Sequence, residues 1–216
     1  MSELVTTYLL NQSENATPMK REDFYTEQIQ AYKTTGSPSR AVEIVQVILF
    51  TQEKEIILQK RSSTKRHNPR LIDKTVGGHV TYGDKPNYTV MVETLQELKV
   101  PSFVLYTDED FQKTYTLLKN YINNTALIQF IDTKTENFIK IIDNEEVLIA
   151  NKYHLYLGIY SGSIKPVDKE ATGVLFYSFE ELVSEMNQIP QLYTEDLKFF
   201  IKHYQDTIQN FLKVLD

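Results

Sequence analysis

The feature that most constrains this chain is a glycine turn followed closely by a helix-forming segment, over residues 75–100 (TVGGHVTYGDKPNYTVMVETLQELKV). The turn contains Gly77 and Gly78, and glycine lets a backbone approach a ligand or another segment closely. Start signals at Asp84 and Pro86, and a proline that follows the segment, predict a helix over about 87–99.

This predicted helix has two chemically different sides, because residues three and four apart are neighbours on a helix surface. One side carries acidic and amide groups, and the other is apolar. The acidic side contains Glu93, Gln96 and Glu97, and the apolar side contains Tyr88, Met91, Leu95 and Leu98. Mg²⁺ is commonly held by one or two carboxylates together with substrate phosphates, so Glu93 and Glu97 could share an ion. From spacing alone, a solvated acidic helix face is the favoured explanation.

The rest of the chain alternates between strand-like and helix-like segments without strict regularity, which predicts a mixed α+β fold with a central sheet flanked by helices. Strands are expected at 41–51, 54–62, 72–80, 125–132, 137–143, 154–162 and 173–178. Helices are expected at 21–33, 105–125 and 179–186, with one C-terminal helix over 194–215. The apolar face of that last helix contains Leu197, Ile201, Tyr204, Ile208, Phe211 and Leu212.

Composition narrows the class of protein. The formal charge of −6 argues against a nucleic-acid partner, and the absence of cysteine excludes disulfides and thiolate chemistry. No apolar run is long enough for a membrane span, and the N-terminus lacks a basic leader and a long apolar stretch. A cytoplasmic location with no membrane partner is therefore expected.

The glycine–helix segment resembles the Nudix box of enzymes that cleave nucleoside diphosphates linked to another group. In that box a glycine is followed after five residues by Glu, and after seven more by Arg-Glu, an aliphatic residue, any residue, Glu-Glu, any residue, glycine and an aliphatic residue. The positions that fit or nearly fit are Gly78, Asp84, Glu93, Gln96, Glu97 and Val100. The departures are Val92, Thr94, Gln96 and Lys99, which makes the box degenerate.

The surrounding sequence resembles the Nudix proteins closest to isopentenyl-diphosphate isomerase, over about residues 40–100 and 152–190. The resemblance implies a mixed β-sheet sandwiched between helices. It divides the chain into an N-terminal extension (1–39), a Nudix-like domain (40–190) with a helical insertion (about 101–140), and a C-terminal helix (191–216). That helix is interpreted as packing on the domain or as a homodimer contact.

The resemblance also implies a site. It implies Mg²⁺ or Mn²⁺ as the cofactor and a small phosphorylated molecule as the substrate. The metal ligands it suggests are Glu93, Glu97, Gln96 and His79, although a hydrogen-bonded structural role is the commoner one for such a histidine. The catalytic candidates are Glu97 first, with Glu93 and Glu170. The substrate-binding candidates are Lys60, Arg61 and Arg66, from a basic loop that is equally well explained as solvated, together with Gly77 and Gly78.

The expected activity is hydrolysis of a diphosphate bond in a nucleoside-diphosphate-like molecule. Two alternatives stay open: a catalytically impaired Nudix-fold module that binds a phosphorylated ligand, and an unrelated α+β protein. The isomerase reaction itself is not expected, because the family's isomerase uses a cysteine where this chain has Gly77.

Overall fold

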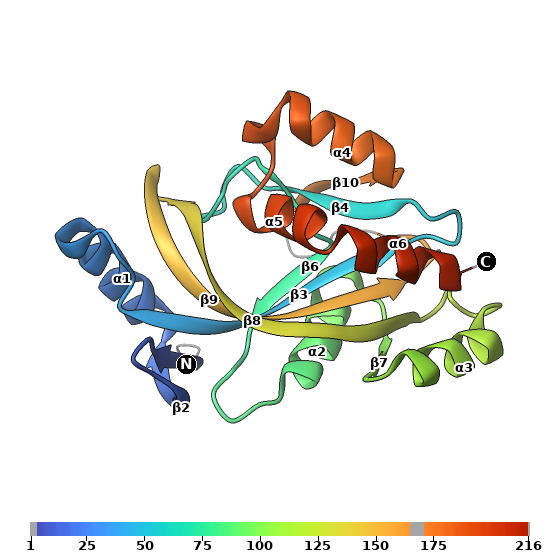
Figure 1. The fold of residues 1–216 in the computed structure, drawn as a ribbon, viewed down its shortest axis with the longest axis horizontal. Helices are drawn as coiled ribbons and strands as arrows, with labels where there is room; N and C mark the ends of the chain where they lie inside the picture. Colours follow the sequence, from blue (N-terminus) through green and yellow to red (C-terminus); the bar gives the residue numbers. More distant parts are fainter. Residues whose placement is uncertain (1–3, 165–170, 216) are drawn as a thin grey trace.

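The computed structural model describes residues 4–164 and 171–215. Its centre is a mixed β-sheet, drawn in Figure 1. Along the main path of this sheet the strands are β10 (Ala171–Tyr177), β4 (Ile56–Arg61), β3 (Arg40–Phe50), β9 (Glu145–Ile159), β8 (Ala126–Ile142) and β7 (Ser102–Leu105). β3 pairs with β9, and β7 with β8, in parallel, whereas the other neighbours on this path are antiparallel. The predicted strands at 41–51, 54–62 and 173–178 correspond to β3, β4 and β10.

β3 is buried along nearly its whole length because both faces of the sheet are covered. Successive side chains of a strand point to opposite faces, and the two sets of β3 side chains enter two separate hydrophobic cores. The first core receives Val42, Ile44, Ile48 and Phe50, and the second receives Val45, Val47 and Leu49. This double burial explains why the sequence of β3 is a nearly continuous apolar run.

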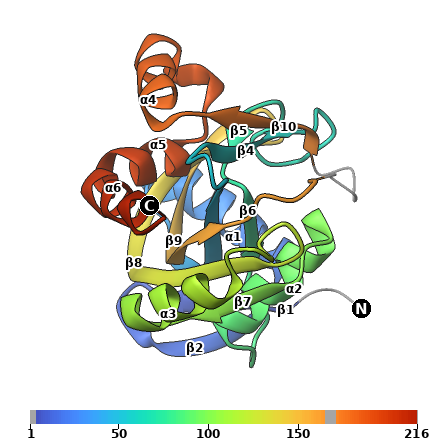
Figure 2. The same ribbon diagram turned by 90° about the vertical axis from the view of Figure 1, so that its right-hand side faces the viewer.

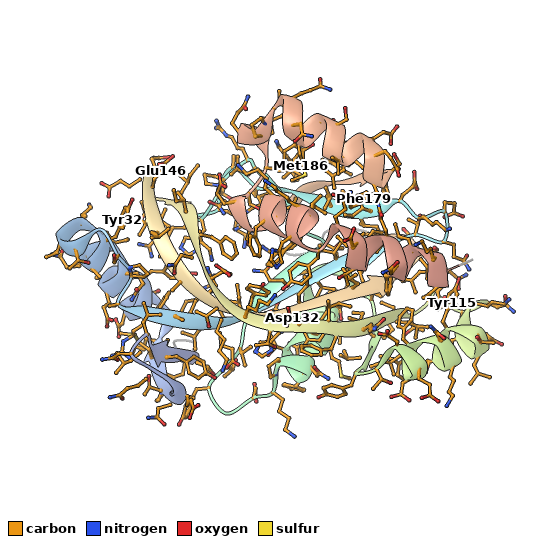
Figure 3. The ribbon with its side chains drawn as sticks, in the orientation of Figure 1. Tyr32, Tyr115, Asp132, Glu146, Phe179 and Met186 are labelled. Carbon is orange, nitrogen blue, oxygen red and sulfur yellow. The ribbon has the colours of Figure 1, made fainter. Side chains whose placement is uncertain are left out.

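Helices cover both faces of the sheet. Figure 2 shows α5 and α6 on one side and α2 on the other, with β6 between them. The helices are α1 (Arg21–Thr35), α2 (Pro86–Leu98), α3 (Asp108–Leu118), α4 (Phe179–Gln188), α5 (Glu195–His203) and α6 (Gln205–Val214), with a short 3₁₀ turn at Pro190–Leu192. In Figure 3 Phe179 and Met186 lie on the side of α4 that faces the rest of the molecule, and both are buried. The predicted α+β architecture is confirmed.

The C-terminal segment differs from the single helix expected over 194–215. It forms two helices that meet at Tyr204, whose backbone leaves the helical region (φ −106°, ψ 22°). The Tyr204 hydroxyl donates to Asp132 Oδ2 at 2.8 Å and lies 2.7 Å from the Tyr153 hydroxyl. These tertiary hydrogen bonds hold Tyr204 against the sheet. The predicted apolar face is confirmed for Leu197 and Ile208, which are buried. The apolar periodicity did not indicate that the helix is interrupted at Tyr204.

The segment 101–142 also differs in detail. The two strands expected at 125–132 and 137–143 are one strand, β8, which pairs with β9 along its length and has a bulge between Phe130 and Asp132. Asp132 is labelled near the middle of this strand in Figure 3, and Glu146 marks the far end of the hairpin, on the same side of the molecule as α1. The helix expected over 105–125 is shorter (α3), and β7 before it was not predicted.

Residues 4–39 join the same sheet. A hairpin of β1 (Leu4–Leu9) and β2 (Gln12–Lys20) pairs with β3 through β1, and α1 follows it. The helix predicted over 21–33 is confirmed as α1, whereas the hairpin had no recognisable pattern in the sequence. Among the residues with assigned structure, no helix has the length and apolar character needed to cross a bilayer.

α2 is oriented against its apolar pattern. Tyr88, Met91 and Leu95 are 57%, 46% and 51% exposed, whereas Glu97 is only 4% exposed. The buried contacts of α2 come from Val90, Leu98 and Thr94, whose hydroxyl donates to the Val90 carbonyl at 2.9 Å. Glu93 and Glu97 therefore face the protein, although Gln96 is exposed, and this excludes the interpretation as a fully solvated acidic face.

The end of α2 has a backbone conformation that favours glycine. Lys99 stands where the box has glycine, and it caps α2 in the left-handed region (φ 59°, ψ 31°). This conformation costs an L-residue roughly 1 kcal/mol and costs glycine almost nothing.

Lys99→Gly is therefore expected to raise the free energy of unfolding by about 0.5–1 kcal/mol, measured by urea denaturation. Lys119→Gly is the matched control, because Lys119 caps α3 in the right-handed region (φ −54°) and glycine brings no relief there. Equal effects of the two substitutions would contradict the explanation.

Candidate active site

The candidate site lies where β4 leaves the edge of β3 and β6 (Val76–His79) pairs with that edge instead. Both strands pair with the same edge of β3, β6 opposite Ile44–Val47 and β4 only opposite Leu49–Phe50. Beyond that point β4 continues next to β5 (Ile72–Asp73) and β10. A cavity of about 130 Å³ is lined by residues from β3, β4, β6, α1, α2, β8 and α5.

Gly78 permits the close contact between β6 and α2. A Cβ atom at this position would lie 2.1 Å from Oε1 of Glu93, so the Glu93 carboxylate occupies the space that any side chain at 78 would need. The glycine is required by this approach rather than by an unusual backbone angle. Gly77 is similarly close to another side chain, since its Cβ would lie 2.8 Å from Cε of Lys74.

α2 brings the two carboxylates of the predicted metal site to one cavity. Glu93 and Glu97 both line it, together with Gly77 and Gly78. Gln96 is exposed and is not among the lining residues, so we leave it out of the ligand set. Within residues 4–164 and 171–215 no group of three or more His, Asp or Glu side chains is arranged to hold a metal ion. The donor set therefore fits Mg²⁺ only in the form that relies on two protein carboxylates and substrate phosphates.

A buried ion network forms the floor of the cavity. Lys74 Nζ lies 2.6 Å from Asp196 Oδ2 and 2.9 Å from Asp73 Oδ1, and the three side chains are at most 8% exposed. Burial disfavours both kinds of charge, but Asp196 and Asp73 raise the pKa of Lys74 above its usual value. In the same way burial opposes ionisation of Asp196, yet Lys74 and Lys140 hold its pKa below the usual range.

The substrate-binding candidates in the basic loop do not converge on the cavity. Arg61 lines it, but its guanidinium is already bound, by Asp73 Oδ2 at 3.0 Å and by the His67 carbonyl at 3.0 and 2.9 Å. Arg66 pairs with Asp143 at 2.8 Å and does not line the cavity. Lys60 does not line it either. The geometry therefore gives Arg61 a structural role and removes Arg66 and Lys60 from the cavity.

His79 lies at the cavity with its Nε2 atom 2.9 Å from the Tyr25 hydroxyl. Burial, followed by the charges of Arg21 and Lys140, lowers the pKa of His79 well below its usual value. His67 is affected in the same way, and burial with Lys140 and Arg21 lowers its pKa to about 3. Both rings are neutral at pH 7, and the Tyr25 contact gives His79 the hydrogen-bonded role rather than that of a metal ligand. Glu170 lies outside the described residues.

Several cavity residues were not predicted from the sequence. They are Arg21, Tyr25, Gln46, Gln59, Asp73, Lys74, Lys140 and Asp196. One of them left a usable signal: Lys140 lies two residues from both Phe138 and Ile142, and alternation in a strand places all three on one face. Phe138 and Ile142 are buried, so Lys140 is a cation on an inward face.

Comparisons with known proteins agree with this architecture. No protein-family model matches the chain. A curated relative, the isopentenyl-diphosphate Delta-isomerase of Streptomyces coelicolor, is 24% identical over 192 residues, which cover 88% of this chain and 74% of the relative. Among solved structures, DR0079 from Deinococcus radiodurans has a TM-score of 0.53 at 13% identity, covering 74% of this chain and 81% of that chain. The MutT protein from Methanosarcina mazei Go1 has a TM-score of 0.51 at 14% identity, covering 76% and 93%.

The mixed sheet and its flanking helices match these structural neighbours, and the chain therefore has the Nudix fold that its sequence resembles.

Proposed function

We propose that the protein is a metal-dependent Nudix-type hydrolase that cleaves a diphosphate bond in a small, nucleoside-diphosphate-like molecule. One observation carries the proposal: Glu93 and Glu97 line the same cavity as Gly77, Gly78 and a set of lysines and arginines. A cavity with carboxylates on one wall and cations on others suits a divalent ion bound together with a phosphorylated ligand.

Glu93 and Glu97 are the residues that would hold Mg²⁺ or Mn²⁺. Such an ion, when bound, lowers the pKa of a water molecule and neutralises charge on the phosphates. Hydrolysis adds water across the P–O–P bond: the water oxygen binds one phosphorus, and the bridging oxygen leaves with the other phosphate. We assign Glu97 to accept the proton from that water, since its carboxylate is buried at the cavity.

The isomerase reaction is not proposed. The isomerase's cysteine position is Gly77 here, and Cε of Lys74 lies 2.8 Å from where a Cβ at this position would stand. The buried ion pairs of Lys74 with Asp196 and Asp73 fix it in that space. Lys74 thus takes the volume that a cysteine side chain would need.

The second candidate function is a Nudix-fold module that binds a phosphorylated ligand without turnover. The exposure of Gln96 favours it, because the cavity then offers two carboxylates where the family's box offers three glutamates. Loss of one carboxylate weakens the hold on a divalent ion, since charge interactions inside a protein exceed those in water several-fold.

Two measurements separate these functions. A panel of nucleoside diphosphate derivatives is incubated with the protein and Mg²⁺ or Mn²⁺, and the monophosphate products are measured by chromatography with and without a chelator. Calorimetry then measures divalent-ion binding with and without ADP. Metal-dependent cleavage supports the hydrolase. Ligand binding without cleavage of any compound supports the binding module, and no divalent-ion binding in either state overturns the hydrolase.

A further inference from the structure

Lys140 is a cation that the proposed reaction has not yet used. It belongs to β8 and reaches the cavity from the far end of the β8–β9 hairpin, whereas Glu93 and Glu97 reach it from α2. Its Nζ donates to Asn151 Oδ1 at 3.1 Å, and Asn151 is fully buried. Across 4–164 and 171–215, no carboxylate lies within ion-pair distance of Lys140.

The carboxylates nearest to Lys140 are committed to other cations. Asp73 accepts from Arg61 at 3.0 Å and lies 2.9 Å from Lys74 Nζ, and Asp196 lies 2.6 Å from that same Nζ. The three cations of this inner cluster therefore face two carboxylates. Burying a charged ammonium such as that of Lys140, with a single neutral hydrogen-bond partner, costs free energy unless an anion also binds to it.

The pKa values of the groups around Lys140 follow from the positive charge in this part of the cavity. Burial lowers the pKa of Lys140 to about 8, which leaves it mostly charged at pH 7. Its charge in turn contributes to the low pKa values of His67 and His79. An ammonium held in such a desolvated place binds an anion more strongly than the same group in water.

Gln46 supplies an independent sign of a ligand. Gln46 lines the cavity, and its amide nitrogen donates to Asp196 Oδ2 at 3.4 Å. Gln46 is 2% exposed, and within the described residues Oε1 has no hydrogen-bond partner. A buried acceptor of this kind calls for a hydroxyl group or a water molecule from whatever fills the cavity.

We propose that Lys140 binds the unsubstituted terminal phosphate of the substrate, which makes the substrate a diphosphate monoester and not a diphosphate that links two organic groups. This rests on the proposed function for the identity of the diphosphate. The charge balance points the same way, because the lining contains five cations and four carboxylates, and a divalent ion adds to the positive excess. A terminal phosphate carries more negative charge than a substituted one and compensates that excess better.

The test uses two base-free probes that cannot be hydrolysed at the bridge: methylenediphosphonate and its P,P′-dimethyl ester. Calorimetry with Mg²⁺ is expected to show tighter binding of the unsubstituted probe by the wild-type protein. Lys140→Met is expected to weaken that binding about 10- to 100-fold, as for loss of one charge-assisted hydrogen bond, and to leave the weak binding of the ester unchanged. Lys113→Met is the control, because Lys113 is 68% exposed and pairs with Glu109 on α3.

Equal binding of the two probes by the wild-type protein overturns the inference, even if Lys140→Met does not fold. So does an unchanged affinity of Lys140→Met for methylenediphosphonate. Activity separates this inference from the hydrolase proposal. If no compound is hydrolysed but the unsubstituted probe binds through Lys140, the hydrolase fails and the phosphate site stands. If ADP-ribose is hydrolysed better than ADP and Lys140→Met does not change that ratio, the hydrolase stands and the phosphate site fails.

Discussion

Replacing Glu97 by glutamine is expected to lower kcat for diphosphate hydrolysis by about 10²–10⁴-fold, the range found when a general base is removed. Glu97 is 4% exposed and lines the cavity with Glu93 and Gly78. Glutamine has nearly the same shape, so α2 keeps its position while the carboxylate that accepts the proton is lost. The measurement is the rate of product formation at saturating substrate, followed by chromatography, with the best compound from the substrate panel.

Gln96→Ala is the matched control for this substitution. Gln96 is the neighbouring residue on the same helix, but it is exposed and outside the cavity. The kcat of Gln96→Ala is expected to stay within about 2-fold of wild type, because most surface substitutions have small effects. Calorimetry is expected to show weaker divalent-ion binding for Glu97→Gln only. A wild-type rate for Glu97→Gln would place the chemistry elsewhere, and a strong loss for Gln96→Ala would restore Gln96 to the site.

The predictable part of this structure is the part in which local pattern and tertiary packing agree. β3 is apolar on both faces, and two cores bury it. The helix after the glycines forms as expected, and it brings Glu93 and Glu97 to one cavity. The glycine turn itself is a wrong prediction, because Gly77 and Gly78 lie in strand β6 and pair with β3. The prediction that Glu93 and Glu97 share one side of the helix needed only their spacing, because helix geometry alone determines which residues lie on the same side.

The orientation of α2 could not be predicted from its own sequence. Its exposed side carries Tyr88, Met91 and Leu95, and its buried side carries Glu97. Hydrophobic periodicity assumes that the apolar side packs inwards. Here the contact of Glu93 with Gly78 and the burial of Val90 set the orientation instead.

The floor of the cavity was missed for a different reason. Asp196 lies more than a hundred residues after Lys74, and only the folded chain brings the two within 2.6 Å. Arg61 looked like a phosphate ligand because other cations lie near it in the sequence. In the structure its guanidinium instead donates hydrogen bonds to Asp73 and to the His67 carbonyl. Charge patterns in sequence show which groups are present and not which partners they find.

The neutral histidines at the cavity predict a strong destabilisation in mild acid. The pKa of His67 is lowered to about 3, and that of His79 is also lowered, whereas an unfolded histidine titrates near 6.5. Below pH 6.5 the unfolded state therefore binds protons that the folded state does not, and stability falls as pH falls. His67 alone is expected to cost about 2 kcal/mol between pH 6 and pH 4.5, and His79 acts in the same direction.

Urea denaturation at several pH values between 6 and 4.5 measures this effect. His67→Gln is expected to lower stability at pH 7, because the ring packs 4.1 Å from the ring of Tyr25, and also to make the slope against pH shallower by about 1.4 kcal/mol per unit. Subtracting the wild-type slope of unfolding free energy against pH from that of the variant removes the contribution of the carboxylates, because these titrate alike in both proteins. His203→Gln is the matched control for loss of a histidine side chain, since His203 is exposed and outside the cavity. A slope for His67→Gln equal to wild type would mean that His67 is protonated in the folded protein, and the electropositive character assigned to the cavity would then be wrong.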